Sequence, residues 1–306
     1  MKFFRCKYTT FFGPILIFSF IMAYASASQN FETTRLKSTA GAGVGSILMD
    51  ESTVLNPAPL AFFNLSAFYI QKATATQTFA NEDSQTVTAP EKSEQLGVIA
   101  SDGRGKAAGS ISYNKIDIDS EKHKRMAASV AYRTGDNTAI GLAYKMDEAA
   151  TKDASAIDYL VKKYSTISIG ITNVFENGFS LGILADDPQE KGPNGARGTV
   201  GMQYVYKNFL TLMTDLGSKY KGNTFSENMF YRIGAQFSLF KDIYLRIGTN
   251  YDQGLASKSK GIGLSWIQPK LMLDFALQSI TLMQRESLNQ KNSIEKESSI
   301  SLSYRF

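Results

Sequence analysis

The stretch at residues 138–146 reads TAIGLAYKM and alternates between two kinds of side chain. In an extended chain, Ile140 and Leu142 point one way, whereas Ala143 and Lys145 point the other way, because successive side chains of a strand lie on opposite faces. One face suits lipid and the other suits water. This pattern predicts a strand in the wall of a transmembrane β-barrel, which is apolar outside and polar inside.

The same alternation recurs along the chain and is sharpest at its end, where residues 300–306 read ISLSYRF. Applied throughout, it predicts fourteen strands. They lie near residues 64–73, 94–101, 106–116, 125–134, 137–147, 162–172, 177–185, 197–206, 208–216, 227–239, 242–252, 259–267, 270–281 and 296–306. After the first 27 residues, no apolar stretch approaches the roughly 18 residues that a membrane helix requires. If the protein crosses a membrane, it does so with strands.

The connections between these strands are expected to alternate in length. Tight turns with Gly, Asn, Asp or Pro fall at 101–105, 134–137, 176–178, 207–208, 240–242 and 268–270. Longer polar loops fall at 74–93, 117–124, 147–161, 186–196, 217–226, 252–258 and 282–295. The expected fold is therefore all-β: an antiparallel up-and-down barrel of about fourteen strands, with both termini at the short-turn, periplasmic rim. A soluble β-sandwich would instead have loops of similar length at both ends.

The beginning of the chain predicts export. Lys2, Arg5 and Lys7 precede an apolar run at 11–22, and the small residues of AYASA follow at 23–27, which is the layout of a secretory signal. Cleavage is expected after Ala25 or after Ala27. The predicted organisation is a signal peptide at 1–25, an N-terminal segment at 26–63 and an outer-membrane barrel at 64–306.

Charge and cysteine usage exclude several classes of protein. The formal charge is +5, but three of the 33 basic residues lie in the signal, which leaves 30 against 28 acidic residues and a charge of +2. A balance so close to neutral gives no indication of nucleic-acid binding. The single cysteine, Cys6, also precedes the apolar run, so the exported chain is expected to contain no disulfide and no thiol chemistry.

Catalysis is not expected either. The only histidine, His123, stands in the charged stretch at 120–125, which suggests an exposed loop imidazole rather than a general base on the barrel wall. One histidine and no exported cysteine leave no transition-metal site, and Asp117, Asp119 and Glu121 are more often solvated charges than a calcium site. We therefore predict no catalytic residue, no metal site and no cofactor.

The segment before the first strand has a composition unlike that of a wall strand. It is small and glycine-rich at its start, and an acidic residue precedes an Asn-Pro-Ala triplet by about six positions. The residues concerned are Gly41, Gly43, Gly45, Asp50, Asn56, Pro57 and Ala58. This segment resembles the N-terminal hatch of the FadL-type transporters and of the wider superfamily that includes PorV and PorQ. The resemblance implies a fourteen-stranded barrel plugged by the hatch.

The residue types of this segment are consistent with a plug inside the barrel. The glycines permit close backbone approach, and Pro57 interrupts both helix and ladder. Asp50 is expected to cap a turn or to pair with an inward arginine. Asn56 is expected either to form an Asx-type turn before the proline or to contact a ligand.

Three further sets of residues follow from the alternation. The charged residues expected to face the lumen are Arg133, Lys145, Asp215, Arg232, Arg246, Asp274 and Glu297. Tyrosines near strand ends are expected to form the interfacial girdles with Trp266; they are Tyr69, Tyr113, Tyr132, Tyr144, Tyr164, Tyr206, Tyr251 and Tyr304. The terminal pattern ending in Tyr304 and Phe306 resembles the recognition signal of barrel proteins, which implies insertion by the barrel assembly machinery.

Two functions fit these predictions. The first is passive transport of a hydrophobic or amphipathic small molecule across the outer membrane. The second is a barrel that does not transport and instead serves as an envelope scaffold or a secretion-associated partner platform. The compact loops, of which the longest is expected at 74–93, make the chain similar to the smaller members of the superfamily, some of which act in secretion. Outer-membrane lipid is the expected surrounding in both cases.

Overall fold

Fourteen antiparallel strands form one closed barrel in the computed structural model, which describes residues 31–79, 90–118, 121–152, 159–193, 195–219, 228–283 and 292–306. Each strand pairs with its neighbours in sequence, and β1 pairs with β14 to close the ring. The strands are β1 (Ser66–Phe79), β2 (Glu91–Asp102), β3 (Ala107–Ile118), β4 (Glu121–Arg133), β5 (Thr138–Lys152), β6 (Tyr159–Val174), β7 (Phe179–Asp186), β8 (Arg197–Tyr206), β9 (Leu210–Lys219), β10 (Met229–Phe240), β11 (Ile243–Asp252), β12 (Ser257–Ile267), β13 (Leu271–Leu282) and β14 (Ser293–Arg305). The strand number and the up-and-down topology expected from the alternation are confirmed.

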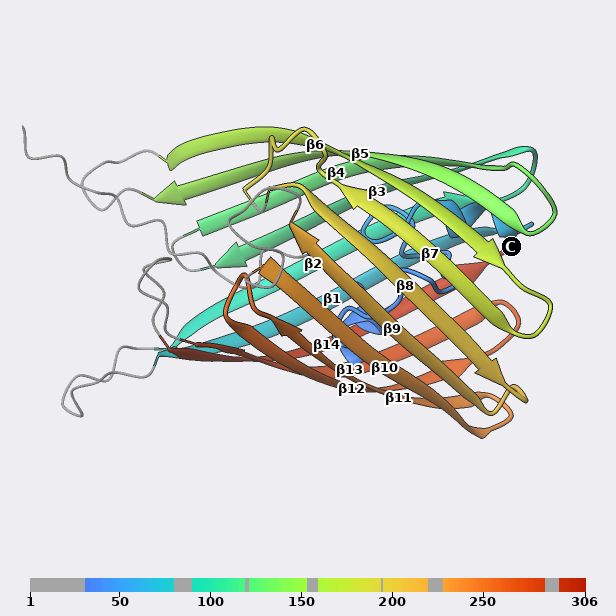
Figure 1. The fold of residues 1–306 in the computed structure, drawn as a ribbon. Helices are drawn as coiled ribbons and strands as arrows, with labels where there is room; N and C mark the ends of the chain where they lie inside the picture. The colour runs from blue at the N-terminus through green and yellow to red at the C-terminus, as the bar shows by residue number, and fades with distance from the viewer. Residues whose placement is uncertain are drawn as a thin grey trace, which may run out of the picture.

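Two short helical pieces precede the wall. They are α1 (Thr34–Ser38) and the 3₁₀ turn η2 (Ala58–Phe62). The N-terminal segment that contains them lies inside the barrel (Figure 1), where α1 packs against β11–β14 and η2 against β3–β6. No helix in the described part of the chain is long and apolar enough to cross a bilayer. The predicted signal peptide lies outside the described residues.

The outer wall is apolar, as the alternation predicts. On β5, Ile140, Leu142 and Tyr144 are each more than two-fifths exposed, whereas Ala139 and Ala143, which alternate with them, are buried. Outward aliphatic and aromatic side chains of this kind continue around the ring. A water-soluble protein would not expose so large a continuous apolar surface, and the band identifies the barrel as a transmembrane one.

The expected difference in length between the two rims is only partly correct. The tight turns are present at the rim where β1 begins, which we call the turn rim. At the opposite, loop rim, the expected loops 117–124 and 252–258 are short, because β3 runs to Ile118, β4 starts at Glu121, β11 ends at Asp252 and β12 starts at Ser257. Strands that project beyond the apolar band keep their ladder hydrogen bonds while their outward residues become polar, so a polar sequence there does not mark a loop.

Three side chains correct the sequence expectations. His123 lies on β4, not in an exposed loop, and is 7% exposed with Nε2 3.0 Å from an oxygen of Glu121. Tyr69 and Tyr164 do not belong to an outer girdle. Tyr69 is buried in the lumen, and Tyr164 lines a lumenal cavity, since both occupy inward positions of their strands. The remaining predicted girdle residues occupy outward positions.

The lipid-facing band leads to a first prediction. Leu142 lies at the middle of the outward apolar run of β5, so Leu142→Arg is expected to lower the free energy of unfolding by about 2–4 kcal/mol, the cost of a charge at the bilayer midplane. Thr76 also faces outward but lies above the band, and Thr76→Arg should cost about 0–1 kcal/mol. Urea midpoints in lipid vesicles measure both. Equal midpoints would show that the band has been misplaced.

Candidate functional site

Residues 31–65 fill the lumen and are referred to below as the hatch. The hatch packs through two apolar clusters. One joins Met49 and Leu60 to small wall residues such as Ala108 and Ala131, and the other joins Leu36 and Val44 to Leu184 of β7. Nearly every hatch side chain is buried, so the hatch and the wall share one interior.

Wall glycines bring the hatch into backbone contact with the barrel. Besides Gly263, six strand glycines are placed so that a Cβ atom on them would lie closer than 3.0 Å to hatch atoms. These residues, the glycine belt, form three directly opposed cross-strand pairs: Gly141 with Gly170, Gly182 with Gly201, and Gly248 with Gly261. A glycine inside a strand weakens the strand by itself, and its use here is the close approach of another backbone. The belt therefore fixes where the hatch can sit.

The glycine-rich turn of the hatch binds a wall carboxylate. Asp215 of β9 accepts hydrogen bonds from the backbone N–H groups of Gly43 and Val44 at 2.9 and 3.1 Å. Gly41 and Gly43 have φ values of +82° and +153°, which only glycine adopts readily, and this turns successive N–H groups toward the carboxylate. Arg232, directly opposite Asp215 on β10, donates to the carbonyl of Gly41 at 3.2 Å.

Asn56 holds the second half of the hatch against the wall. Its Oδ1 accepts from the N–H of Ala58 at 3.1 Å, which forms the Asx-type turn around Pro57. Its Nδ2 donates to the carbonyl of Val44 at 2.8 Å and to Thr172 of β6 at 3.0 Å. With Nδ2 and Oδ1 engaged in these contacts, the arrangement favours the structural role of Asn56 over contact with a ligand.

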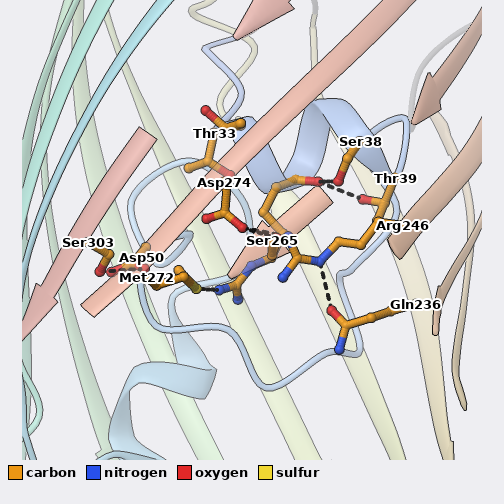
Figure 2. A network of polar contacts seen from close by, with 12 residues as sticks. Thr33, Ser38, Thr39, Asp50, Gln236, Arg246, Ser265, Met272, Asp274 and Ser303 are labelled. Atoms are coloured by element: carbon orange, nitrogen blue, oxygen red, sulfur yellow. Dashed lines mark hydrogen bonds and ion pairs between the residues drawn. The ribbon is translucent and has the colours of Figure 1, made fainter. Parts of the chain in front are cut away.

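A buried charge network joins the first half of the hatch to the wall (Figure 2). Arg246 of β11 donates to Asp274 of β13 at 2.7 Å and to Gln236 at 2.7 Å, and Ser265 bonds to both members of the pair. The side chains of Arg246 and Asp274 are each 2% exposed. A pair so far from water depends on each partner for its stability.

Hatch charges extend this network. Arg35 lies 3.8 Å from Glu51 and donates to the sulfur of Met272. The neighbouring Asp50 accepts from Ser303 of β14 at 3.3 Å. Burial raises the pKa of the Asp50 carboxyl to about 6, and the charge of Glu51 adds to the increase. In the described residues Asp50 thus bonds to a wall serine, and neither the turn cap nor the ion pair with an inward arginine that the sequence suggested is among its contacts.

The hatch also bridges the seam, which is the pairing of β1 with β14. Thr34 donates its backbone N–H to the hydroxyl of Tyr69 on β1 at 2.9 Å, and its hydroxyl lies 2.7 Å from that of Ser299 on β14. Lys37 pairs with Glu297 of β14 and donates to Gln95 of β2 at 2.7 Å. One short helix thus contacts the strands on both sides of the closure.

The predicted lumen residues do not form one site. Lys145 bonds to Asp186 at 2.9 Å near the loop rim, whereas Arg133 donates to the carbonyls of Ala61 and Phe62 at the turn rim. Asp215 and Arg232 contact the glycine-rich turn of the hatch. Arg246 and Asp274 form the separate buried network on the wall. The sequence analysis missed the glycine belt, although glycines within alternating strands were a visible signal.

Among the described residues, cavities lie on opposite faces of the hatch, and two of them concern the site. The loop-side cavity is about 110 Å³ and is lined by apolar groups such as Phe31, Leu184 and Phe230 together with Lys145, Arg197 and Arg232. The turn-side cavity is about 280 Å³ and lies near Leu48, Met213, Ile267 and Arg305. Both linings mix apolar and charged side chains. The hatch separates the two spaces.

The C-terminus completes the wall. Tyr304 and Phe306 point outward, with ring centroids 6.1 Å apart, and the backbone of Phe306 bonds to that of Ser66 at 2.9 Å. Among the described residues, no group of three or more His, Cys, Asp or Glu side chains is placed to hold a metal ion.

No family model matches the chain, and no curated protein matches it. Solved structures do. The Ralstonia pickettii toluene transporter TbuX is 13% identical, with a TM-score of 0.65 over 91% of this chain and 99% of that one. The Pseudomonas putida toluene transporter TodX is 10% identical, with a TM-score of 0.63 over 88% and 96%. A Pseudomonas aeruginosa FadL homologue is 11% identical, with a TM-score of 0.63 over 89% and 98%. The chain therefore has the fold of the FadL-type barrels, as its N-terminal segment suggested.

Proposed function

We propose that this protein is an outer-membrane channel through which a small amphipathic molecule passes without an energy source. The observation that carries the proposal is the loop-side cavity. It places apolar groups, among them Phe31 and Phe230, beside the guanidinium groups of Arg197 and Arg232. A pocket with an apolar lining and a few charged groups suits a ligand with both kinds of surface. The toluene transporters with this fold support a transport role rather than an enzymatic one.

The orientation belongs to the same proposal. The N-terminal signal exports the chain, the assembly machinery reads the pattern ending in Tyr304 and Phe306, and the turn rim, where Phe306 bonds to Ser66, faces the periplasm. The loop-side cavity then receives the solute from outside. The turn-side cavity lies beyond the hatch, so a solute reaches it only when the hatch shifts.

A partner platform is the second candidate, and one observation favours it. The hatch is bonded to β1, β6, β9 and β14, and the two cavities beside it in the described part of the chain are small, as a scaffold that never opens would require. Several connections at the loop rim are also short, including the one between Asp252 and Ser257. Such a protein would need no path through its lumen.

Uptake into vesicles separates the two candidates. Labelled phenylalanine, which has an apolar ring and a charged end, is expected to enter vesicles that contain the protein faster than protein-free vesicles, whereas labelled sucrose is not. Thr199 lines the loop-side cavity, so Thr199→Trp should fill it and slow entry several-fold. Thr76→Trp, on the outward face, is the matched control and should leave the rate unchanged. Uptake equal to that of protein-free vesicles would contradict transport of this class of solute and favour the platform.

A further inference from the structure

The outward face of the barrel is unevenly charged at the loop rim. From β2 to β6, outward lysines stand beside outward acids, as in Lys115 with Asp117 and Lys163 with Glu148 at 3.2 Å. On the strands from β10 through β14 to β1, every outward charged side chain among the described residues near the loop rim is a lysine. They are Lys258 and Lys260 on β12, Lys296 on β14 and Lys72 on β1, of which Lys72 lies 3.6 Å from Glu94 of β2.

Three of these lysines gather around β13. Lys260 and Lys296 are both in register with Ser279, one from each side, so they stand two strands apart, or roughly 10 Å. Lys258 is in register with Thr281, one step nearer the rim. Lys260 and Lys296 make no ion pair among the described residues, and Lys258 contacts only the ring of Tyr251, at 5.4 Å. We call Lys258, Lys260 and Lys296, with Ser279 and Thr281 between them, the β13 patch.

The patch lies directly above the lipid-facing band. On β12 the outward residue after Lys260 is Ile262, and on β13 the one after Ser279 is Leu277, each nearly half exposed. Farther down, Leu264 and Phe275 continue the apolar surface. Acyl chains that cover these residues bring their head group to the height of the lysines. The adjoining outward Tyr231 and Tyr251 mark the same interface.

We propose that the β13 patch binds the phosphate groups of an acylated, phosphorylated lipid in the outer leaflet. Lysines near a membrane surface attract anionic lipids, and three ammonium groups at this spacing present more positive charge than one phosphate neutralises. The hydroxyls of Ser279 and Thr281 add donors between them. The lipid is held by its charge above and by its chains against the band below, which is a site distinct from the lumen.

Binding to nanodiscs of stated lipid tests the proposal. The detergent-extracted protein is titrated with phosphatidylcholine nanodiscs that contain either diphosphorylated lipid A or the same lipid after phosphatase treatment. The parent is expected to prefer the phosphorylated lipid. The triple variant Lys258→Gln, Lys260→Gln, Lys296→Gln should bind it roughly a hundredfold more weakly, because each lysine near a membrane surface contributes about 1 kcal/mol to the binding of an anionic lipid. Added inorganic phosphate should not compete, because it lacks the chains.

The control removes lysines that already have acidic neighbours. Lys124→Gln with Lys163→Gln, next to Glu148, should leave the affinity unchanged, since those charges are compensated. Lys260→Glu alone should weaken binding more than Lys260→Gln, and heat-modifiable migration confirms that each variant is folded. Equal affinity of parent and triple variant, equal loss in the control, or equal binding of the phosphatase-treated lipid would overturn the proposal. Competition by inorganic phosphate would reduce the patch to a general anion site and overturn it as well.

Discussion

Removal of residues 28–60 behind the N-terminal export segment is expected to leave a barrel that still assembles but conducts ions across planar bilayers, whereas the parent conducts little. A fourteen-stranded wall encloses a lumen too wide for inward side chains alone to fill. The hatch occupies that space, and the wall residues beneath it are mostly small. Without the hatch, Asp215 and the glycine belt face water, and the strand ladder that holds the ring remains complete.

A single substitution in the hatch should produce a smaller increase in conductance than the truncation does. Asn56→Ala removes the bonds from Nδ2 to Val44 and Thr172 and the Asx-type turn, so it should give intermediate, flickering conductance. Asn173→Ala is the control, because Asn173 bonds to Thr138 outside the hatch. A truncated barrel that stays closed would mean that side chains or loops seal the lumen without the hatch, and the platform function would then be preferred to transport.

The second large effect concerns the Arg246–Asp274 pair. Asp274→Asn keeps the shape of the side chain but leaves Arg246 buried without its countercharge, so the free energy of unfolding should fall by about 3–5 kcal/mol. Glu148→Gln removes a carboxylate from partly exposed pairs with Lys124 and Lys163 and should cost less than about 1 kcal/mol. Urea midpoints in the same lipid compare the two.

A double replacement shows what the pair contributes. Arg246→Met with Asp274→Leu removes both charges and is expected to recover most of the lost stability, because an apolar pair requires no desolvation of ions. If Asp274→Asn has the midpoint of the parent, water reaches the network and the pair is not buried in the membrane-inserted protein. If the double variant is as unstable as the single one, the network positions the hatch through its hydrogen bonds rather than its charges.

The barrel could be predicted from the sequence because each wall residue has one of two environments, lipid or lumen. Segments such as 138–146 and 300–306 alternate at the period that this contrast imposes. The alternation weakens where strands leave the membrane, since both faces then meet water or polar groups. This explains why His123 was expected in a loop and why the start of β4 at Glu121 was missed.

The interior was harder to predict, because contacts there join residues far apart in the sequence. The composition of residues 41–58 indicated a plug, but nothing in it specified that Gly43 would bind Asp215 or that Asn56 would reach Thr172. Tyr69 is a good strand former, and its burial beside Thr34 and Gln71 shows that it faces inward. The six glycines of the belt could have been selected in advance, since an interior strand glycine suggests a close neighbour, but the identity of that neighbour could not.

The position of α1 across the seam has a consequence for biogenesis. Thr34 contacts Tyr69, 35 residues away, and Ser299, 265 residues away, so its docking site is complete only when the first and last strands have met. Bringing such distant segments together carries an entropic cost that local hairpins do not, and each contact of α1 offsets part of it. Before the first and last strands pair, α1 therefore has only part of its docking site, and closure of the ring supplies the rest.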